Sequence, residues 1–388
     1  MKRVLVIATG GTIASAEEGS GLAPALTGEQ LVAFVPEVAQ MCHAEVSQVM
    51  NVDSTNMRPE GWLAIADEVR RRYGDFDGFV VLHGTDTLAY TAAGLSYLVQ
   101  RSPKPVVLTG SQLPMGDPGT DGKRNLLYAV RVACDDAAAG IMVAFGGKTI
   151  LGTAARKVRT RDFEAFDSLN VPDLGAVGEN GVQWAAAARE LMAPGAADGC
   201  ATAGEARAGR EGFSADGCSA CEGRGRIFAR TERERASVLS GGSERDSVVA
   251  GPSAPRFFDA LNPRVMVLKV TPGMNGRVID ALRPLCDALV VEAFGLGGIP
   301  EYAGVTDALL NWADAGKTLV MTTQCPFEGA DLSVYEVGRA FCSRPGVLMG
   351  GAATTEALLA KTMWALAQAE RPDGTIDREK LTALFASC

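Results

Sequence analysis

Short runs of aliphatic and β-branched residues alternate along the chain with segments in which apolar residues recur every three or four positions. The runs predict buried strands and the segments predict helices. In the first half, the expected strands are 4–8, 46–52, 79–82, 105–109 and 140–145, and the expected helices are 28–38, 59–72, 88–100 and 123–133. Alternating strands and helices are typical of a doubly wound, mostly parallel sheet.

The same alternation returns near the end of the chain. The expected strands are 265–270, 288–292, 318–323 and 346–349, and the expected helices are 280–285, 302–315, 334–340 and 355–369. The predicted fold class is therefore α/β, with a larger N-terminal doubly wound, mostly parallel sheet domain and a smaller C-terminal α/β domain.

Residues 193–256 break the pattern because glycine, alanine, serine, arginine and glutamate dominate there. Such a composition buries too little apolar surface to offset the entropy lost on ordering. We therefore expect a catalytic domain at 1–192, a disordered insertion at 193–256 and a second domain at 257–388. Cys218 and Cys221 have the spacing of half a zinc knuckle, but a closed site needs four ligands, so incidental thiols are favoured.

Composition and charge exclude several classes of binding partner. The 388 residues are 47% apolar and carry a net charge of -9, which offers no basic surface for nucleic acid or an anionic membrane. No apolar run reaches the roughly 18–20 residues that span a bilayer, and the first residues do not resemble a secretory signal. Nine scattered cysteines fit reduced thiols, so a cytoplasmic protein is expected.

Small and hydroxyl-bearing residues follow four of the expected strands, at 9–12, 53–56, 83–87 and 110–114. In doubly wound sheets the ligand lies beyond the carboxyl ends of the strands, so these segments are expected to form one pocket. His43 and His83 are the only histidines, which leaves neither a metal-ligand set nor a Ser-His-Asp triad. The Gly10-Gly11 pair lacks the remaining glycines of a dinucleotide loop.

A hydroxyl nucleophile without histidine needs another base, and Lys157 is one candidate. Its neighbours include three arginines, so a solvated basic loop is the alternative and is favoured on charge pattern alone. Thr12 and Asp86 could likewise be helix caps, and Ser54 a loop hydroxyl. Taken one at a time, each of these residues fits a structural role better than a catalytic one.

Taken together, the segments favour a functional role over a structural one. Residues 9–14 (TGGTIA) and 83–89 (HGTDTLA) resemble the two signature segments of the bacterial-type L-asparaginase family. Residues 109–114 (TGSQLP), Lys157, 322–325 (TTQC) and 351–357 (GAATTEA) extend the likeness over nearly the whole chain outside the insertion. The closing segments are more similar to the cytoplasmic type I branch.

The resemblance implies an amidohydrolase that converts L-asparagine to L-aspartate and ammonia through an acyl-threonine. It makes Thr12 the nucleophile and assigns catalytic roles to Thr85, Asp86 and Lys157. The substrate-binding residues that it implies are Gly11, Asp53, Ser54, Thr55, Gly84, Thr85, Asp86 and Ser111. It also implies no cofactor, no metal, and a homodimer or homotetramer in which a neighbour's second domain closes the site.

The implied roles agree with the residue types. Glycine at 10 and 11 allows the backbone to approach an amide closely. Backbone N–H groups of Gly11, Thr85 or Ser111 could stabilise an oxyanion. Asp86 facing the substrate α-ammonium would make a charge-assisted pair, and Ser54 and Thr55 would hold the α-carboxylate.

One position departs from the family pattern. Members usually carry a tyrosine on the loop after the first motif, but here Leu22 aligns with it and no tyrosine precedes Tyr73. Another side chain, with Glu17 and Glu18 as candidates, or water substitutes for the tyrosine, or activity is reduced, or the substrate differs. The alternatives are therefore an amidohydrolase acting on glutamine or on an amidated tRNA, the latter disfavoured by the acidic charge, and a non-catalytic amino-acid-binding sensor.

Overall fold

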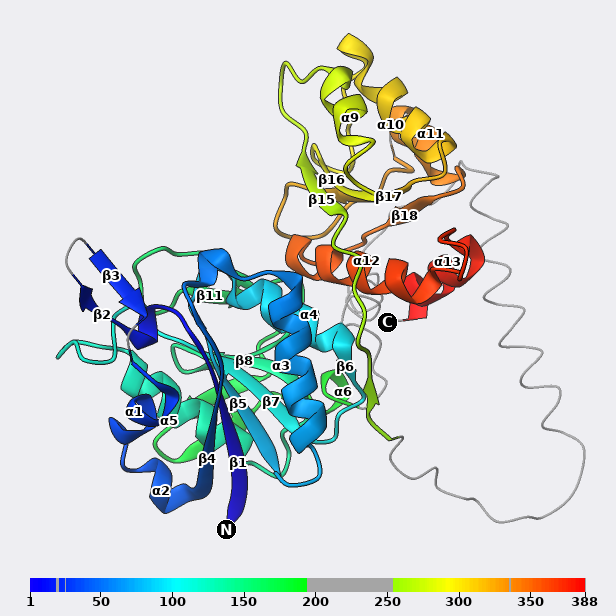
Figure 1. Ribbon diagram of the computed structural model, residues 1–388. Helices are drawn as coiled ribbons and strands as arrows, with labels where there is room; N and C mark the ends of the chain where they lie inside the picture. The colour runs from blue at the N-terminus through cyan, green and yellow to red at the C-terminus, as the bar shows by residue number, and fades with distance from the viewer. Residues whose placement is uncertain (19–20, 25, 194–253, 335, 388) are drawn as a thin grey trace, which may run out of the picture.

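The computed structural model describes residues 1–18, 21–24, 26–193, 254–334 and 336–387, and the prediction for 193–256 therefore falls almost entirely outside the described residues. The described residues form two α/β domains, shown from blue to green and from yellow to red in Figure 1. The architecture is the predicted one, a larger mostly parallel sheet followed by a smaller parallel sheet.

The sheet of the N-terminal domain has the strand order β13-β12-β9-β8-β7-β5-β1-β4. Its five parallel strands are β1 (Lys2–Gly10), β4 (Cys42–Val52), β5 (Gly78–Leu82), β7 (Pro105–Thr109) and β8 (Gly140–Phe145). Antiparallel strands β9 (Lys148–Leu151), β12 (Gly175–Gly178) and β13 (Gly181–Trp184) complete one edge. The other edge is β4, whose carboxyl end lies beside that of β1.

Helices cover both faces of this sheet. On one face lie α1 (Gly28–Ala33), α2 (Val38–Met41) and α5 (Gly122–Ala133), and on the other lie α3 (Pro59–Arg72) and α4 (Leu88–Leu98). Strand β1 shows how the sequence builds both layers. Val4 and Val6 are buried in the core that contains α5, whereas Leu5 and Ile7 are buried in the core that contains α3 and α4. The apolar run of this strand, residues 4–8, therefore serves two cores at once.

Shorter elements connect or flank this framework. They are the hairpin β2 (Ser15–Glu18) and β3 (Gly21–Pro24), the pair β10 (Ala155–Lys157) and β11 (Phe166–Ser168), the pair β6 (Val99–Gln100) and β14 (Arg256–Phe257), the 3₁₀ turns η1 (Thr12–Ala14) and η2 (Ser54–Asn56), and α6 (Ala188–Leu191). Strand β14 follows the undescribed segment and pairs antiparallel with β6, so the start of the second domain returns to the first.

The C-terminal domain is built on a parallel sheet of order β15-β16-β17-β18. These strands are β15 (Val265–Lys269), β16 (Ala288–Ala293), β17 (Thr318–Thr323) and β18 (Val347–Met349). One face carries α9 (Gly276–Leu282), α10 (Val305–Asp314), which follows the turn η3 (Tyr302–Gly304), and α11 (Glu336–Cys342). The other face carries α12 (Thr355–Ala369), and α13 (Arg378–Ser387) follows it.

Helix α12 joins the two domains. Most of its residues are buried, and its apolar side chains share one core with the C-terminal sheet and with α4 of the N-terminal domain. The rings of Tyr97 on α4 and Trp364 on α12 stack with centroids 5.9 Å apart. Figure 1 shows α12 between the C-terminal sheet and α4.

Several predicted boundaries were wrong for identifiable reasons. The expected helix 28–38 divides into α1 and α2 because Pro36 lacks an N–H and disfavours a helical conformation at Val35. The expected helix 88–100 ends at Leu98, and the next two residues form β6. The expected helix 302–315 begins regularly only at Val305, because Gly304 has a left-handed φ of 68°.

Among the described residues, no helix is long and apolar enough to span a bilayer.

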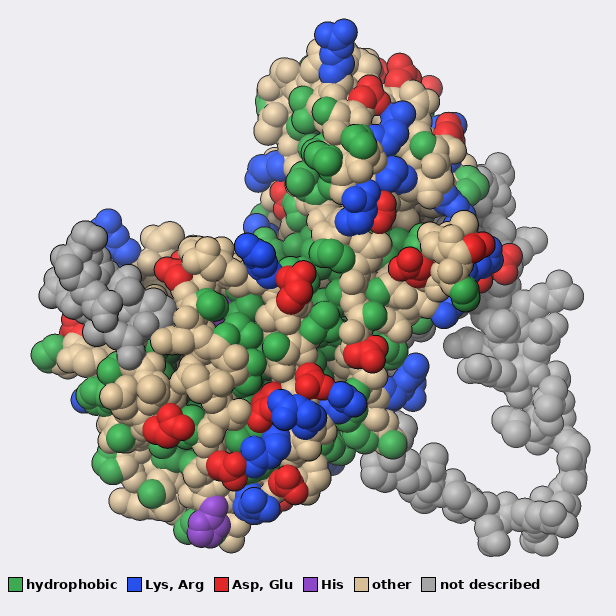
Figure 2. Space-filling view, in the orientation of Figure 1, with side chains coloured by type: hydrophobic (Ala, Val, Ile, Leu, Met, Phe, Trp, Pro, Cys, Tyr) green, Lys and Arg blue, Asp and Glu red, His purple; other side chains and the backbone are tan. Residues whose placement is uncertain are grey.

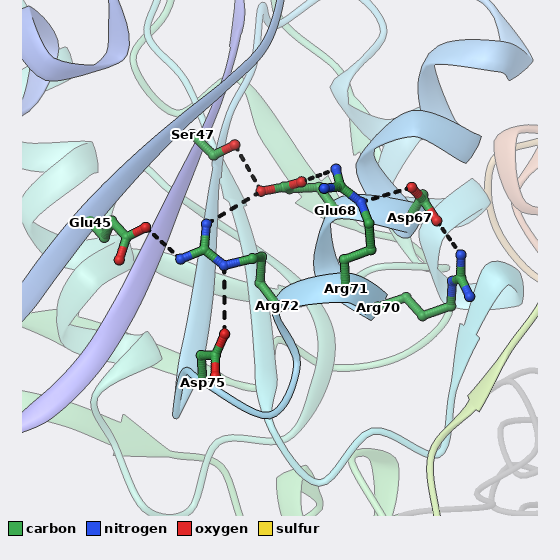
Figure 3. A network of polar contacts seen from close by, with 8 residues as sticks. All are labelled: Glu45, Ser47, Asp67, Glu68, Arg70, Arg71, Arg72 and Asp75. Carbon is green, nitrogen blue, oxygen red and sulfur yellow. Dashed lines mark hydrogen bonds and ion pairs between the residues drawn. The ribbon is translucent and has the colours of Figure 1, made fainter.

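The outer face of α3 carries a network of charged side chains that reaches the edge strand β4 (Figure 3). Glu68 is only 4% exposed, accepts a hydrogen bond of 2.9 Å from Ser47 Oγ, and is also bonded to Arg71. Arg72 lies 3.9 Å from the same carboxylate and bridges it to Glu45. On the face drawn in Figure 2, acidic and basic side chains intermingle.

We predict that Glu68→Gln lowers the free energy of unfolding by about 1–3 kcal/mol, because a buried charged acceptor is lost. Ser47 can still donate to the amide oxygen, so the loss reflects the arginine contacts. Urea denaturation measures the change. Asp75→Asn is the control, because this side chain is 60% exposed and 3.7 Å from Arg72; it should change stability by less than about 0.5 kcal/mol. Equal losses in both variants would contradict the prediction.

Candidate active site

Three of the polar strand-end segments approach one another closely at two glycines. Gly11 follows β1 with a φ of 83°, and a Cβ placed on it would lie 2.3 Å from the Cα of Gly84, which follows β5. A Cβ on Gly84 would lie 2.6 Å from the hydroxyl oxygen of Ser54, which follows β4. Glycine is therefore required at 11 and 84 for these loops to meet.

Lys157 joins two of the other predicted residues. Its Nζ donates to Thr85 Oγ1 at 2.7 Å and to Asp86 Oδ1 at 2.7 Å. Thr85 is 4% exposed, and the side chain of Asp86 is 57% exposed. The site thus pairs a sheltered hydroxyl with an accessible carboxylate, both held by one ammonium group from β10.

Gln112 fixes the direction of the Thr85 hydroxyl. Its Nε2 donates to the backbone carbonyl of Asp162 at 3.1 Å, and because that carbonyl can only accept, Oε1 must face Thr85. Thr85 Oγ1 therefore donates its proton to Gln112, over 3.2 Å, and accepts one from Lys157. Sequence reasoning singled out the segment 109–114 but missed this role, and no pattern in the sequence could have identified it.

Thr12 begins the turn η1 directly after the glycine pair and is partly exposed. Its neighbours Ile13 and Ala14 are buried and anchor the turn in the core below α5. Within the described chain the Thr12 hydroxyl makes no hydrogen bond, so it is not hydrogen-bonded to Thr85, Asp86 or Lys157. The backbone of Gly11, which precedes Thr12, packs against that of Gly84, which precedes Thr85.

Among the remaining predicted residues, Asp53 and Ser111 use their side chains in local hydrogen bonds, whereas Ser54 is held through its backbone carbonyl. Ser54 is 4% exposed, and its position is fixed by the hydroxyl of Thr87, which donates to the Ser54 carbonyl at 2.7 Å. Asp53 instead accepts from both the N–H and the hydroxyl of Thr55, at 2.8 and 2.9 Å. Ser111 is fully buried and donates to the Leu113 carbonyl. The Asp53 and Ser111 side chains therefore hold local turns.

One expectation about the oxyanion was wrong. The N–H of Gly11 donates to the carbonyl of Val52 at 2.9 Å and closes the irregular end of the β1–β4 pair, so it is not available to an oxyanion. The N–H groups of Thr85 and Ser111 make no hydrogen bond to the described residues. These two amides are the remaining candidates among the three.

His83 has a structural role. It is fully buried, and burial lowers its pKa to about 4, so the ring is neutral near pH 7. Its Nδ1 lies 2.7 Å from the Gly84 carbonyl and must donate to it, which leaves Nε2 to accept from the hydroxyl of Thr91 at 2.9 Å. The histidine of the second motif thus anchors the loop to α4. No group of three or more potential metal ligands occurs among the described residues.

Comparisons with known proteins assign this fold to a protein family. The model of the N-terminal domain of asparaginase matches residues 3–189, and the model of the glutaminase/asparaginase C-terminal domain matches residues 264–377. Together they define a two-domain amidohydrolase. The chain belongs to the asparaginase family, which confirms the resemblance read from the two signature segments.

Three curated relatives illustrate the range of the family. The chain is 33% identical to an L-asparaginase of Thermococcus kodakarensis, over 94% of this chain and 92% of that protein. It is 29% identical to L-asparaginase 1 of Escherichia coli, over 95% and 92%. It is also 29% identical to one component of a glutamyl-tRNA(Gln) amidotransferase of Pyrococcus abyssi, over 94% of this chain and 72% of that protein. The solved structure of the Thermococcus kodakarensis protein superposes with a TM-score of 0.73 at 32% identity, covering 99% and 96% of the two chains.

We predict that Gly11→Ala disrupts the site, because the new Cβ would collide with the Gly84 backbone. The melting temperature should fall, and turnover of an amide substrate should drop at least about 100-fold, since the loops that place Thr12 beside Thr85 must separate.

Gly140→Ala is the matched control. Gly140 has a similar φ of 77°, but nothing lies within 4 Å of its added Cβ, so this variant carries the backbone strain without the collision. Differential scanning fluorimetry and an ammonia-release assay measure both variants. If both lost activity to the same extent, the contact between the loops would not be the cause.

Proposed function

We propose that this protein hydrolyses the side-chain amide of L-asparagine to L-aspartate and ammonia through an acyl intermediate on Thr12. The observation that carries the proposal is the contact of Lys157 with Thr85 and Asp86, together with the close packing of Gly11, which precedes Thr12, against Gly84, which precedes Thr85. The names of the relatives from Thermococcus kodakarensis and Escherichia coli support the same substrate.

In this proposal the substrate is held by its two α-substituents. The exposed carboxylate of Asp86 accepts the α-ammonium group, while the Ser54 hydroxyl donates to the α-carboxylate. The Thr55 hydroxyl joins it by turning away from Asp53, to which it donates in the structure. Lys157 neutralises part of the charge on Asp86 and holds its Oδ1 in place. Fixing both ends of a small amino acid brings its amide to the nucleophile and removes much of the entropic cost of attack.

Two balanced steps follow. The Thr12 oxygen attacks the amide carbon, its proton is passed to the departing nitrogen, and ammonia leaves as the ester forms. Water then attacks the ester, gives one proton back to the threonine oxygen, and releases aspartate. The amides of Thr85 and Ser111 stabilise the oxyanion in both steps.

Thr85 mediates the proton movements in this scheme. Its hydroxyl donates to Gln112 and accepts from Lys157, which leaves one lone pair on Oγ1 for a further donor. That donor is the Thr12 hydroxyl in the first step and the hydrolytic water in the second. As Thr85 Oγ1 takes up this proton it releases its own, which it donates to Gln112 in the resting site, to the departing nitrogen in the first step and to the Thr12 oxygen in the second. This assignment suits a chain with Leu22 where the family usually has a tyrosine.

A second candidate reaction is supported by the amidotransferase relatives, whose names refer to amide transfer on glutamyl-tRNA(Gln). Glutamine is therefore the competing small substrate, and an amino-acid sensor without turnover is the competing class. A cytoplasmic location and assembly into a homodimer or homotetramer stay predictions.

We predict that Thr12→Ala and Lys157→Met each reduce ammonia release from L-asparagine at least about 1,000-fold while the fold is retained, since one removes the nucleophile and the other the charge that holds Thr85 and Asp86. The wild-type protein should be assayed with asparagine and glutamine side by side. Mass spectrometry of acid-quenched enzyme should show an aspartyl adduct on Thr12.

Thr382→Ala is the control, because that exposed hydroxyl on α13 only bonds to its own helix. Near-normal turnover by the Thr12 variant would show that the nucleophile is another group. Faster release from glutamine would favour the alternative substrate, and no release from either amide would favour the sensor.

A further inference from the structure

The first turn of α12 contacts the segment that carries Lys157. Thr354, the N-cap of this helix, donates from its hydroxyl to the Thr153 carbonyl at 3.1 Å. Asn170, which follows β11, donates to the Ala352 carbonyl at 2.7 Å. The C-terminal domain therefore supports β10 and β11 directly.

Strand alternation directs two neighbouring side chains of β10 to opposite sides. Lys157 turns toward Thr85 and Asp86, and Arg156 turns toward α12. There its Nε lies 3.8 Å from Oε1 of Glu356, on the first turn of that helix. One ion pair between the domains thus acts on the residue next to the candidate catalytic lysine.

Glu356 lies in an environment that disfavours its charge. Its side chain is 9% exposed, and Oε2 has no hydrogen-bond partner among the described residues. Burial raises the pKa of the carboxyl, and although Arg156 opposes this effect, the nearby Glu292 adds to it. The carboxylate of Glu292 accepts a hydrogen bond of 2.6 Å from the Thr355 hydroxyl.

The other titratable groups near Glu356 do not stabilise its charge. Tyr90 faces the cluster from α4 and is itself partly buried, so the pKa of its phenol is raised. Lys269 on β15 lies 4.0 Å from Glu292 rather than from Glu356. A buried carboxylate with one long ion pair and an unpaired oxygen costs stability. A residue that costs stability and contacts the strand of a catalytic lysine is a candidate for function.

We propose that Glu356 is a positioning residue for Lys157. By holding Arg156 on the far side of β10, it fixes the strand so that Nζ of Lys157 reaches both Thr85 and Asp86. The inference rests on the proposed function, in which Lys157 takes part in amide hydrolysis. It assigns the C-terminal domain of the same chain a part in setting the geometry of the site.

Glu356→Gln tests the inference, because it keeps the size of the side chain and removes its charge. We expect kcat for amide hydrolysis to fall about tenfold and KM to change less than threefold, since a displaced lysine affects the reaction more than substrate binding. The melting temperature should not fall, because a desolvated charge has been removed. A residue with only a structural role would lower the melting temperature and leave kcat intact.

Glu68→Gln is the matched control, another buried glutamate paired with arginines but located on α3, away from the site (Figure 3). It should lower the melting temperature and leave kcat unchanged, the reverse of Glu356→Gln. In an Arg156→Met background, Glu356→Gln should change kcat less than twofold, because the residue through which it acts is gone.

Three results would overturn the inference. They are a wild-type kcat in Glu356→Gln, a parallel loss of kcat and melting temperature, and an undiminished effect in the Arg156→Met background. Turnover of the wild-type protein is measured first with asparagine and glutamine. Its absence would overturn the proposed function and this inference together, whereas an active wild type with an unaffected Glu356→Gln variant would overturn this inference alone.

Discussion

The burial of α12 is the constraint on which the arrangement of the two domains depends. Most residues of this helix are buried, and the C-terminal sheet covers one side while α4 covers another. The first domain therefore cannot bury α4 fully without the second. Because the first turn of α12 also contacts Thr153 and Arg156, the packing that joins the domains extends to the strand that carries Lys157.

Much of the fold could be predicted because buried parallel strands have a strong signal. Strands such as β7 and β17 are continuous apolar or β-branched runs, and α3 and α12 have apolar residues at helical spacing, so their bounds agree with the prediction. The errors lie where local chemistry overrides periodicity, as at Pro36 and Gly304. The hairpin of β12 and β13 and the helix α13 were missed because their apolar patterns are short and interrupted by glycine or charge.

The site could be predicted only in part, and for a different reason. Residue types after each strand indicated which segments meet, and the family resemblance selected Thr12, Thr85, Asp86 and Lys157 from them. The structure brings three of these four into direct contact. The direction of each hydrogen bond could not be predicted, because it depends on partners distant in sequence. The Gly11 amide is occupied by Val52, and the Thr85 proton is taken by Gln112.

Under the proposed function, these directions restrict which group can take a proton from Thr12. His83 is neutral, buried and bonded on both ring nitrogens, so it cannot serve as a base. Lys157 donates to both Thr85 and Asp86, so its contacts in this arrangement are those of a donor. In the proposed reaction the Thr85 hydroxyl is then the relay: it accepts the Thr12 proton and releases its own, which it donates to Gln112 in the structure, to the departing nitrogen. A site built in this way depends on the exact position of Lys157, because a displaced ammonium would no longer donate to Thr85 or hold Oδ1 of Asp86.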